Sequence, residues 1–302
     1  MKKILTFLTI SASVFLLASC DKPAPTQLID DTNNDYEVEL LNKDLENQYY
    51  TSGSDTSGIT QDITRITNLI SVSGVKITNA IGTKYFSLAQ AMFFDKSKPI
   101  NYSDGRLLAY QTFLPGTIKF NGTQSNIVPY KIRFRDKGMQ EDTLIGWKYV
   151  LLNLHYGHPD PFYFNYDASV SFAFEPFIGG NNLLFNILTP EEITGRVTLN
   201  GKRMNHNLEV ELNWNSGKTK KISVIVGLIR PGQLFSIPLY KFRTFDDGEM
   251  IIPSRLLNKI PLDRFEKIVF TFVRSYEIYQ GAGNNEMLVS SQSIHSIVID
   301  IP

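Results

Sequence analysis

The chain has 302 residues and carries 30 basic and 30 acidic side chains, so its formal net charge is zero. With 42% apolar and 20% charged residues, its composition is neither that of a disordered chain nor that of a polytopic membrane protein. Its single cysteine excludes an intramolecular disulfide framework and any zinc or iron–sulfur site built from four cysteines.

Residues 1–19 have the organisation of a secretory signal peptide. Two lysines precede an apolar run from Ile4 to Leu17, which is too short to span a bilayer comfortably. The run ends in Leu17-Ala18-Ser19-Cys20, which resembles the lipobox of bacterial lipoproteins. That resemblance implies cleavage after Ser19, lipidation of Cys20 with chains such as palmitate, and attachment to a membrane. An ordinary secretory signal is the alternative, but the only cysteine of the chain falls on this position.

The residue after the cysteine can indicate the membrane to which a lipoprotein is attached. Asp21 resembles the inner-membrane retention signal of enterobacterial lipoproteins, although other phyla read these positions differently. We expect a lipid-anchored protein of the bacterial cell envelope, with the outer membrane or the cell surface favoured over the inner membrane.

Residues 20–58 are predicted to be an acidic, flexible tether. From Asp21 to Gly58 the net charge is −7, and the few apolar residues cannot compensate the entropy of ordering. A short helix over Tyr36 to Tyr50 is compatible with the positions of its apolar residues. The acidic residues lack the spacing of a calcium-binding loop. Residues 59–302 carry +5, too diffuse for a nucleic-acid interface, so no nucleic acid is expected as a partner.

The C-terminal segment, residues 189–302, is predicted to be a β-sandwich. Leu208 to Trp214 alternates apolar and polar residues, which is the period of a strand with one buried face. Asn200-Gly201 fits a two-residue hairpin turn, and the Pro253 to Ile260 segment fits one short helical turn. The other expected strands are 193–199, 221–229, 235–245, 249–252, 267–276 and 294–301.

Residues 59–188 show the same pattern and are predicted to be a first β-sandwich. Its expected strands lie within 63–77 and at 85–94, 106–113, 117–120, 127–134, 147–154 and 169–174. No segment predicts a helix of ten or more residues, so the fold class is all-β, with two tandem antiparallel sandwiches. The boundary is expected at Gly179 to Asn182 or at Thr189 to Glu191, where turn-forming residues interrupt the apolar runs.

At this level the chain resembles uncharacterised bacterial lipoproteins built from immunoglobulin-like sandwiches. The residues that carry the resemblance are Gly116 to Gly122 with Trp147, then Leu208 to Trp214, Asp246 to Pro253 and Leu256-Leu257. The resemblance covers most of the mature chain and implies a fold and a location. It implies no reaction, because such proteins carry no established active site.

Motifs for catalysis or cofactor binding are absent from the sequence. It contains no G-x-S-x-G, no H-E-x-x-H and no P-loop, so we expect no enzyme and no cofactor. Gly281 to Glu286 begins like a dinucleotide-binding loop but lacks the third glycine and the following helix. Asp246 and Asp247 are adjacent carboxylates, which in a turn usually accept backbone N–H groups.

One local cluster could bind a ligand. His155, Tyr156, His158 and Tyr163 lie in a stretch with ten aromatic residues between Trp147 and Phe177. Phe162, Phe164 and Tyr166 share one strand face and are expected in the core, whereas Tyr156 and Tyr163 remain for a sugar platform or a protein contact. A metal site at His155, His158 and Asp160 is the weaker alternative, because extended spacing separates the two imidazoles. We expect no metal.

The sequence therefore predicts a non-enzymatic envelope protein with a structural or binding role and a membrane as its first partner, through Cys20. Two alternatives stay open at this point. One is a carbohydrate-binding surface lipoprotein that uses the 155–166 loop. The other is a pilus-type subunit in which an edge strand pairs with a neighbouring molecule. A glycan or a protein is the expected further partner.

Overall fold

The computed structural model describes residues 36–41, 50–51, 68–136, 139–154, 162–233, 236–260, 262–280 and 286–301. About two thirds of them lie in strands, and the only α-helix among them is the single turn α2 (Ser254–Leu257), which confirms the all-β class. The signal peptide, Cys20 and most of the acidic tether lie outside the described residues. No described helix is long and apolar enough to cross a membrane.

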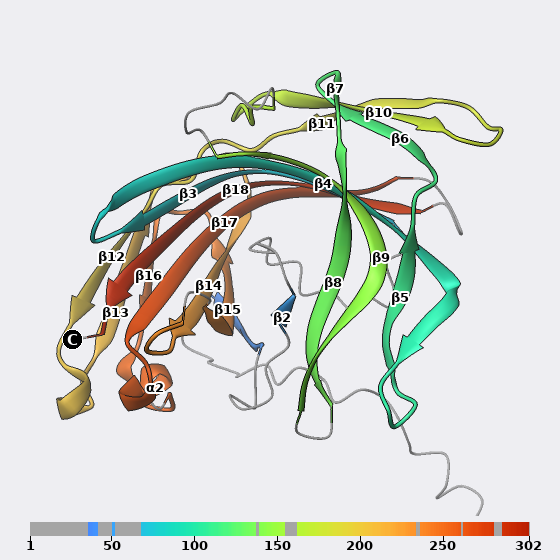
Figure 1. Ribbon diagram of the computed structural model, residues 1–302. Coiled ribbons are helices and arrows are strands. Elements are labelled where there is room, and N and C mark those ends of the chain that lie inside the picture. Colours follow the sequence, from blue (N-terminus) through green and yellow to red (C-terminus); the bar gives the residue numbers. More distant parts are fainter. Residues whose placement is uncertain are drawn as a thin grey trace, which may run out of the picture.

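Eleven strands form one main sheet, whose long central strands arch across the molecule (Figure 1). Ten of them follow one another in space in this order: β1 (Tyr36–Leu40), β15 (Ile237–Phe245), β14 (Lys221–Ile229), β17 (Lys267–Gln280), β18 (Met287–Asp300), β3 (Asn68–Asn79), β4 (Gly82–Asn101), β9 (Met139–Asn153), β8 (Asn126–Asp136) and β2 (Tyr50–Thr51). The eleventh, β5 (Leu107–Phe113), pairs with the far end of β4, where β9 has left it.

The centre of this sheet joins the two halves of the chain. β18, the last strand, pairs in parallel with β3, the first long strand, from Met287 opposite Asn68 to Ile297 opposite Thr78. All other strand pairs of the described chain are antiparallel. Strands from 59–188 and from 189–302 therefore share one sheet, and two separate immunoglobulin-like sandwiches are not confirmed.

Two smaller sheets complete the fold. The four-stranded sheet has the order β11 (Leu183–Leu188), β10 (Ser169–Pro176), β6 (Gly116–Phe120) and β7 (Thr123–Gln124), and the three-stranded sheet has the order β12 (Gly195–Asn200), β13 (Glu209–Trp214) and β16 (Glu249–Ile252). Two 3₁₀ turns, η2 (Arg203–Asn205) and η3 (Leu262–Arg264), and α2 lie in the connections. In Figure 1 the four-stranded sheet lies above the arch, and the three-stranded sheet lies at its left end.

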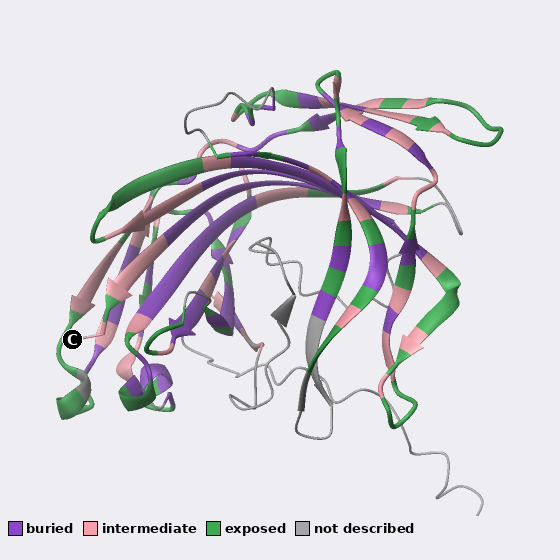
Figure 2. Cartoon of the chain, viewed as in Figure 1, coloured by how far each residue is buried: buried purple, intermediate pink, exposed green. Residues whose placement is uncertain are grey.

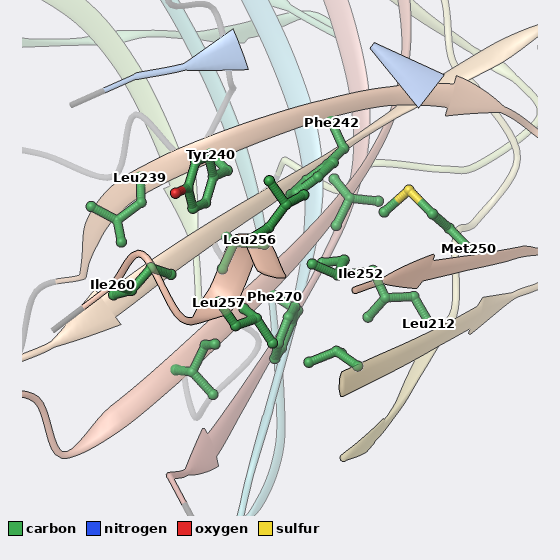
Figure 3. Close-up of a cluster of buried hydrophobic side chains, with 14 of the residues drawn as sticks. Leu212, Leu239, Tyr240, Phe242, Met250, Ile252, Leu256, Leu257, Ile260 and Phe270 are labelled. Carbon is green, nitrogen blue, oxygen red and sulfur yellow. The ribbon is translucent and has the colours of Figure 1, made fainter. Parts of the chain in front are cut away.

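Each small sheet encloses its own hydrophobic core against the main sheet. The first core is formed by the four-stranded sheet and contains buried residues from Ile70 to Ile187, with Val289 of β18 added. The second core is formed by the three-stranded sheet, α2 and strands β14, β15 and β17. It contains buried residues from Ile193 to Phe272, with Val38 of β1 added, and Figure 3 shows its side chains around Phe242, Ile252 and Phe270.

Three local expectations are wrong. Tyr36–Leu40 is a strand rather than part of a helix, because its alternating pattern buries Val38 against β15. Asn200-Gly201 does not close a two-residue hairpin, since eight residues including η2 connect β12 to β13. Gly179 to Asn182 is the turn between β10 and β11, which pair in one sheet.

Candidate functional site

The structure describes one of the four residues of the predicted ligand site. His155, Tyr156 and His158 lie outside the described residues, so their convergence stays a prediction. Tyr163 is 45% exposed. The predicted core role of its neighbours is confirmed, because Phe162 and Phe164 are buried.

The backbone on both sides of Tyr163 is fixed to the main sheet. Asn153 donates a hydrogen bond from Nδ2 to the carbonyl of Phe162 at 3.0 Å. The backbone N–H of Phe164 donates to Ser87 Oγ, also at 3.0 Å. Tyr163 is thus an exposed aromatic ring on a rigid base.

A buried polar seam crosses the main sheet between the two cores. We define the seam as Ser291, Ser293 and His295 of β18 with Arg274 of β17, all at most 3% exposed. Alternate residues of a strand point to the same face, so the three β18 side chains lie on the face that Val289 presents to the first core. On that face, β18 has the apolar Val289, then the three polar seam residues, and then the apolar Ile297.

The seam residues bind the backbone of residues 188–195, the segment that connects the two small sheets. Ser291 Oγ donates to the carbonyl of Leu188, and the Ile193 N–H donates to Ser293 Oγ at 2.8 Å. The Gly195 N–H donates to His295 Nδ1 at 2.8 Å. A connection that crosses a sheet face would otherwise bury unpaired backbone groups, and these bonds satisfy them.

The contacts of His295 fix its tautomer. Because Nδ1 accepts from Gly195, the ring proton sits on Nε2, which lies 2.9 Å from Thr78 Oγ1. Burial, with a smaller contribution from the charge of Lys76, lowers the pKa of His295 to about 4. His295 is neutral at physiological pH.

Arg274 forms the most extensive contacts of the seam. Its Nε and Nη2 each bind one carboxylate oxygen of Asp246 at 2.8 Å, and both side chains are buried. Nη2 also donates to the carbonyl of Asn215 at 2.6 Å, and Nη1 donates to the carbonyl of Glu192 at 3.1 Å. A single side chain therefore connects β17, the 188–195 segment and the loop after β13.

Asp246 is held by four donors. Besides Arg274, Trp214 Nε1 donates to Oδ1 at 3.0 Å, and Thr219 Oγ1 donates to Oδ2 at 2.5 Å. Burial alone raises the pKa of Asp246, but the bonds from Arg274 and Thr219 and the arginine charge outweigh it, so the pKa lies below the usual range. With two donors on each oxygen, the carboxylate has no acceptor site left for a substrate. The arrangement supports a structural role.

The Arg274–Asp246 pair was missed by the sequence analysis. Asp247 fits the expectation, because its carboxylate accepts from the Glu249 N–H at 3.5 Å, but Asp246 is an ion-pair partner in the interior. The usable signal was an arginine inside the apolar run of β17, since a buried arginine requires an acidic partner.

The largest exposed apolar side chains of the four-stranded sheet gather on one hairpin. We define the hairpin patch as Phe177, Ile178, Leu184 and Leu188, which are 61–92% exposed. Leu184 and Leu188 are on the same outer face of β11, which is the terminal strand of its sheet. Figure 2 shows the tip of this hairpin as exposed. Exposed apolar groups on an edge strand are typical of a contact surface.

Among the described residues, no group of three or more His, Cys, Asp or Glu side chains could hold a metal ion. The sequence matches no known family model and no curated protein.

Proposed function

We propose that the protein is a lipid-anchored, non-enzymatic component of the bacterial envelope that binds a protein partner through the hairpin patch. The observation that carries the binding role is the exposure of Phe177, Ile178, Leu184 and Leu188 on one hairpin. Desolvating several such side chains drives protein association. Arg274 and Asp246, which could have served catalysis, are saturated by bonds inside the protein.

The two-sandwich organisation is part of this proposal. We assign residues 59–188 and 189–302 to two immunoglobulin-like modules that share the central strands of the main sheet. The split between the cores supports the assignment, because the first core draws all but Val289 from the first segment. The seam joins the two modules, so the patch is presented on a stiff support.

Membrane attachment is tested by replacing Cys20 with Ala in the full chain. The wild-type protein should incorporate labelled palmitate and enter the detergent phase of a phase separation. The Cys20→Ala variant should lose both properties. A wild-type protein that stays entirely in the aqueous phase would contradict the anchoring.

The binding role is tested with a photo-crosslinking amino acid placed at Leu184 in living cells. Ile251 is the matched control, because it is also an exposed aliphatic residue but lies on β16 of the three-stranded sheet. We expect a discrete cross-linked protein from position 184 and none from position 251. Equal cross-linking at both positions, or none at either, would refute the assignment of the patch.

Tyr163 favours a second candidate function, binding of a carbohydrate. An exposed ring on a fixed backbone is what a sugar platform requires. Glycan-array binding that Tyr163→Ala abolishes, with thermal stability unchanged, would support it. Binding that survives this substitution would exclude Tyr163 as the platform.

A further inference from the structure

β1, the terminal strand of the main sheet beside β15, packs into the second core although it is far from that core in the sequence. β1 pairs with β15 over five residues, from Tyr36 opposite Thr244 to Leu40 opposite Tyr240. Val38 is 1% exposed within the second core. The Tyr36 ring packs edge-on against Phe242, with ring centres 5.5 Å apart. Without β1, apolar side chains of β15 would face water.

Polar contacts add selectivity to this pairing. Glu37 binds Lys221 of β14 at 2.8 Å, a contact that lowers the pKa of Glu37. Leu41 donates its N–H to the carbonyl of Leu239 at 2.8 Å. The acceptor edge thus recognises an alternating strand with one buried apolar residue and an acidic residue before it.

The chain connectivity does not tie β1 to its own acceptor. Glu37 and Lys221 are 184 positions apart, and no turn links β1 to β15. In the other direction, eight residues separate Leu41 from Tyr50, where β2 begins and pairs with β8. A chain of that length reaches up to ~30 Å, so it allows β1 to bind an adjacent molecule.

We propose that the outer edge of β15 is a strand-acceptor site that exchanges residues 36–40 between two copies of this chain. Exchange re-forms the same contacts, so the two arrangements differ in free energy mainly through the concentration of copies. A tethered strand has an effective concentration on the order of 1 mM at its own acceptor, so a second copy competes above about this concentration. The proposal does not depend on lipid anchoring, which would only raise the local concentration.

The register supplies a direct test with the full chain. Glu37 lies opposite Arg243, and both residues are exposed, so neither is part of the core. We would prepare Glu37→Cys and Arg243→Cys as separate proteins, each with Cys20→Ser, mix them above millimolar concentration and oxidise them. Directly opposed residues of neighbouring strands are close enough for a disulfide. Exchange shifts the product from monomer to a mixed dimer on a non-reducing gel.

Two controls make the result decisive. Glu37→Cys mixed with Arg196→Cys, an exposed position on β12, should give no mixed dimer above background. Adding Val38→Asp to the Glu37→Cys chain should abolish the mixed dimer, because a charge cannot enter the core. When Glu37→Cys and Arg243→Cys are combined in one chain, the two cysteines should form an intramolecular disulfide. If this combined variant closes but the two separate variants give no more dimer than the Arg196 control, strand exchange does not occur.

Discussion

Arg274 and Asp246 form a side-on ion pair in the interior, with two nitrogen–oxygen distances of 2.8 Å and both side chains shielded from water. Such a pair is stable only because each remaining polar atom finds a partner. Here the partners come from Trp214, Thr219 and the backbone of the 188–195 segment. The pair therefore depends on the path of the connection between the two cores.

Breaking this pair from one side should destabilise the protein strongly. Arg274→Met leaves the Asp246 carboxylate buried without its main partner, for which we expect a loss of about 3–5 kcal/mol in the free energy of unfolding. Urea denaturation followed by tryptophan fluorescence measures the change, since Trp214 touches Asp246. The double variant Arg274→Met/Asp246→Leu should regain part of that loss. A single variant as stable as the wild type would contradict the role of the pair.

The stability of the protein should fall as the pH is lowered from about 6.5 to about 4. His295 in the folded protein has its pKa lowered to about 4, whereas the unfolded chain binds the proton at an ordinary pKa near 6.5. The unfolded state binds more protons in this window, so stability present above pH 6.5 is lost as the pH falls. The largest change is about 3 kcal/mol.

The pH effect is measured as the free energy of unfolding between pH 4 and 7. His295→Gln should flatten the dependence in this window. His206→Asn is the matched control, because His206 is exposed directly after η2 and asparagine tolerates its positive φ. A slope that His295→Gln leaves unchanged would show that another group causes it.

Replacing Gly217 with alanine, which adds only a methyl group, should destabilise the protein. A Cβ at this position would lie 2.5 Å from Arg274 Cζ, so the guanidinium would have to move away from Asp246. We expect Gly217→Ala to lower the thermal midpoint by several degrees, as a loss of 1–3 kcal/mol does in a chain of this size (about 2–4 °C per kcal/mol). Ser216→Ala, one position earlier and exposed, is the control and should change little. Equal midpoints for both variants would contradict the close contact.

The two cores should unfold together. β17, β18 and β3 are neighbours in one sheet, so loss of either core exposes strands that the other core uses. Phe120→Leu in the first core and Phe242→Leu in the second should each cost about 1 kcal/mol and move one shared calorimetric transition. Two transitions, with only one displaced by each variant, would instead show independent modules.

Local patterns predicted most of the strands. The alternation from Leu208 to Trp214 identifies β13 because Val210, Leu212 and Trp214 all face the second core. Asn-Gly pairs favour two-residue turns, and Asn121-Gly122, which connects β6 to β7, has positive φ at both residues. Such features depend on neighbours in the sequence, so one sequence suffices to find them.

Contacts between distant segments could not be predicted in this way. Nothing near Met287 or Asn68 indicates that β18 and β3 pair in parallel, because strand order is decided by which faces can be buried together. The sequence likewise places Tyr36–Leu40 in the predicted tether, because the strand that pairs with it lies far along the chain. For the ligand site, the sequence identified Tyr163 as exposed, but the bonds that fix its base come from Ser87 and Asn153.

The position of β18 in the sheet affects how the chain folds while it is being synthesised. Synthesis proceeds from the N-terminus, yet the strand between β17 and β3 emerges after both of these neighbours. Until then, both neighbours present bare edges that can pair with the wrong chain. A chain still bound to the ribosome is consequently the form most prone to aggregation, and the one that a chaperone must shield.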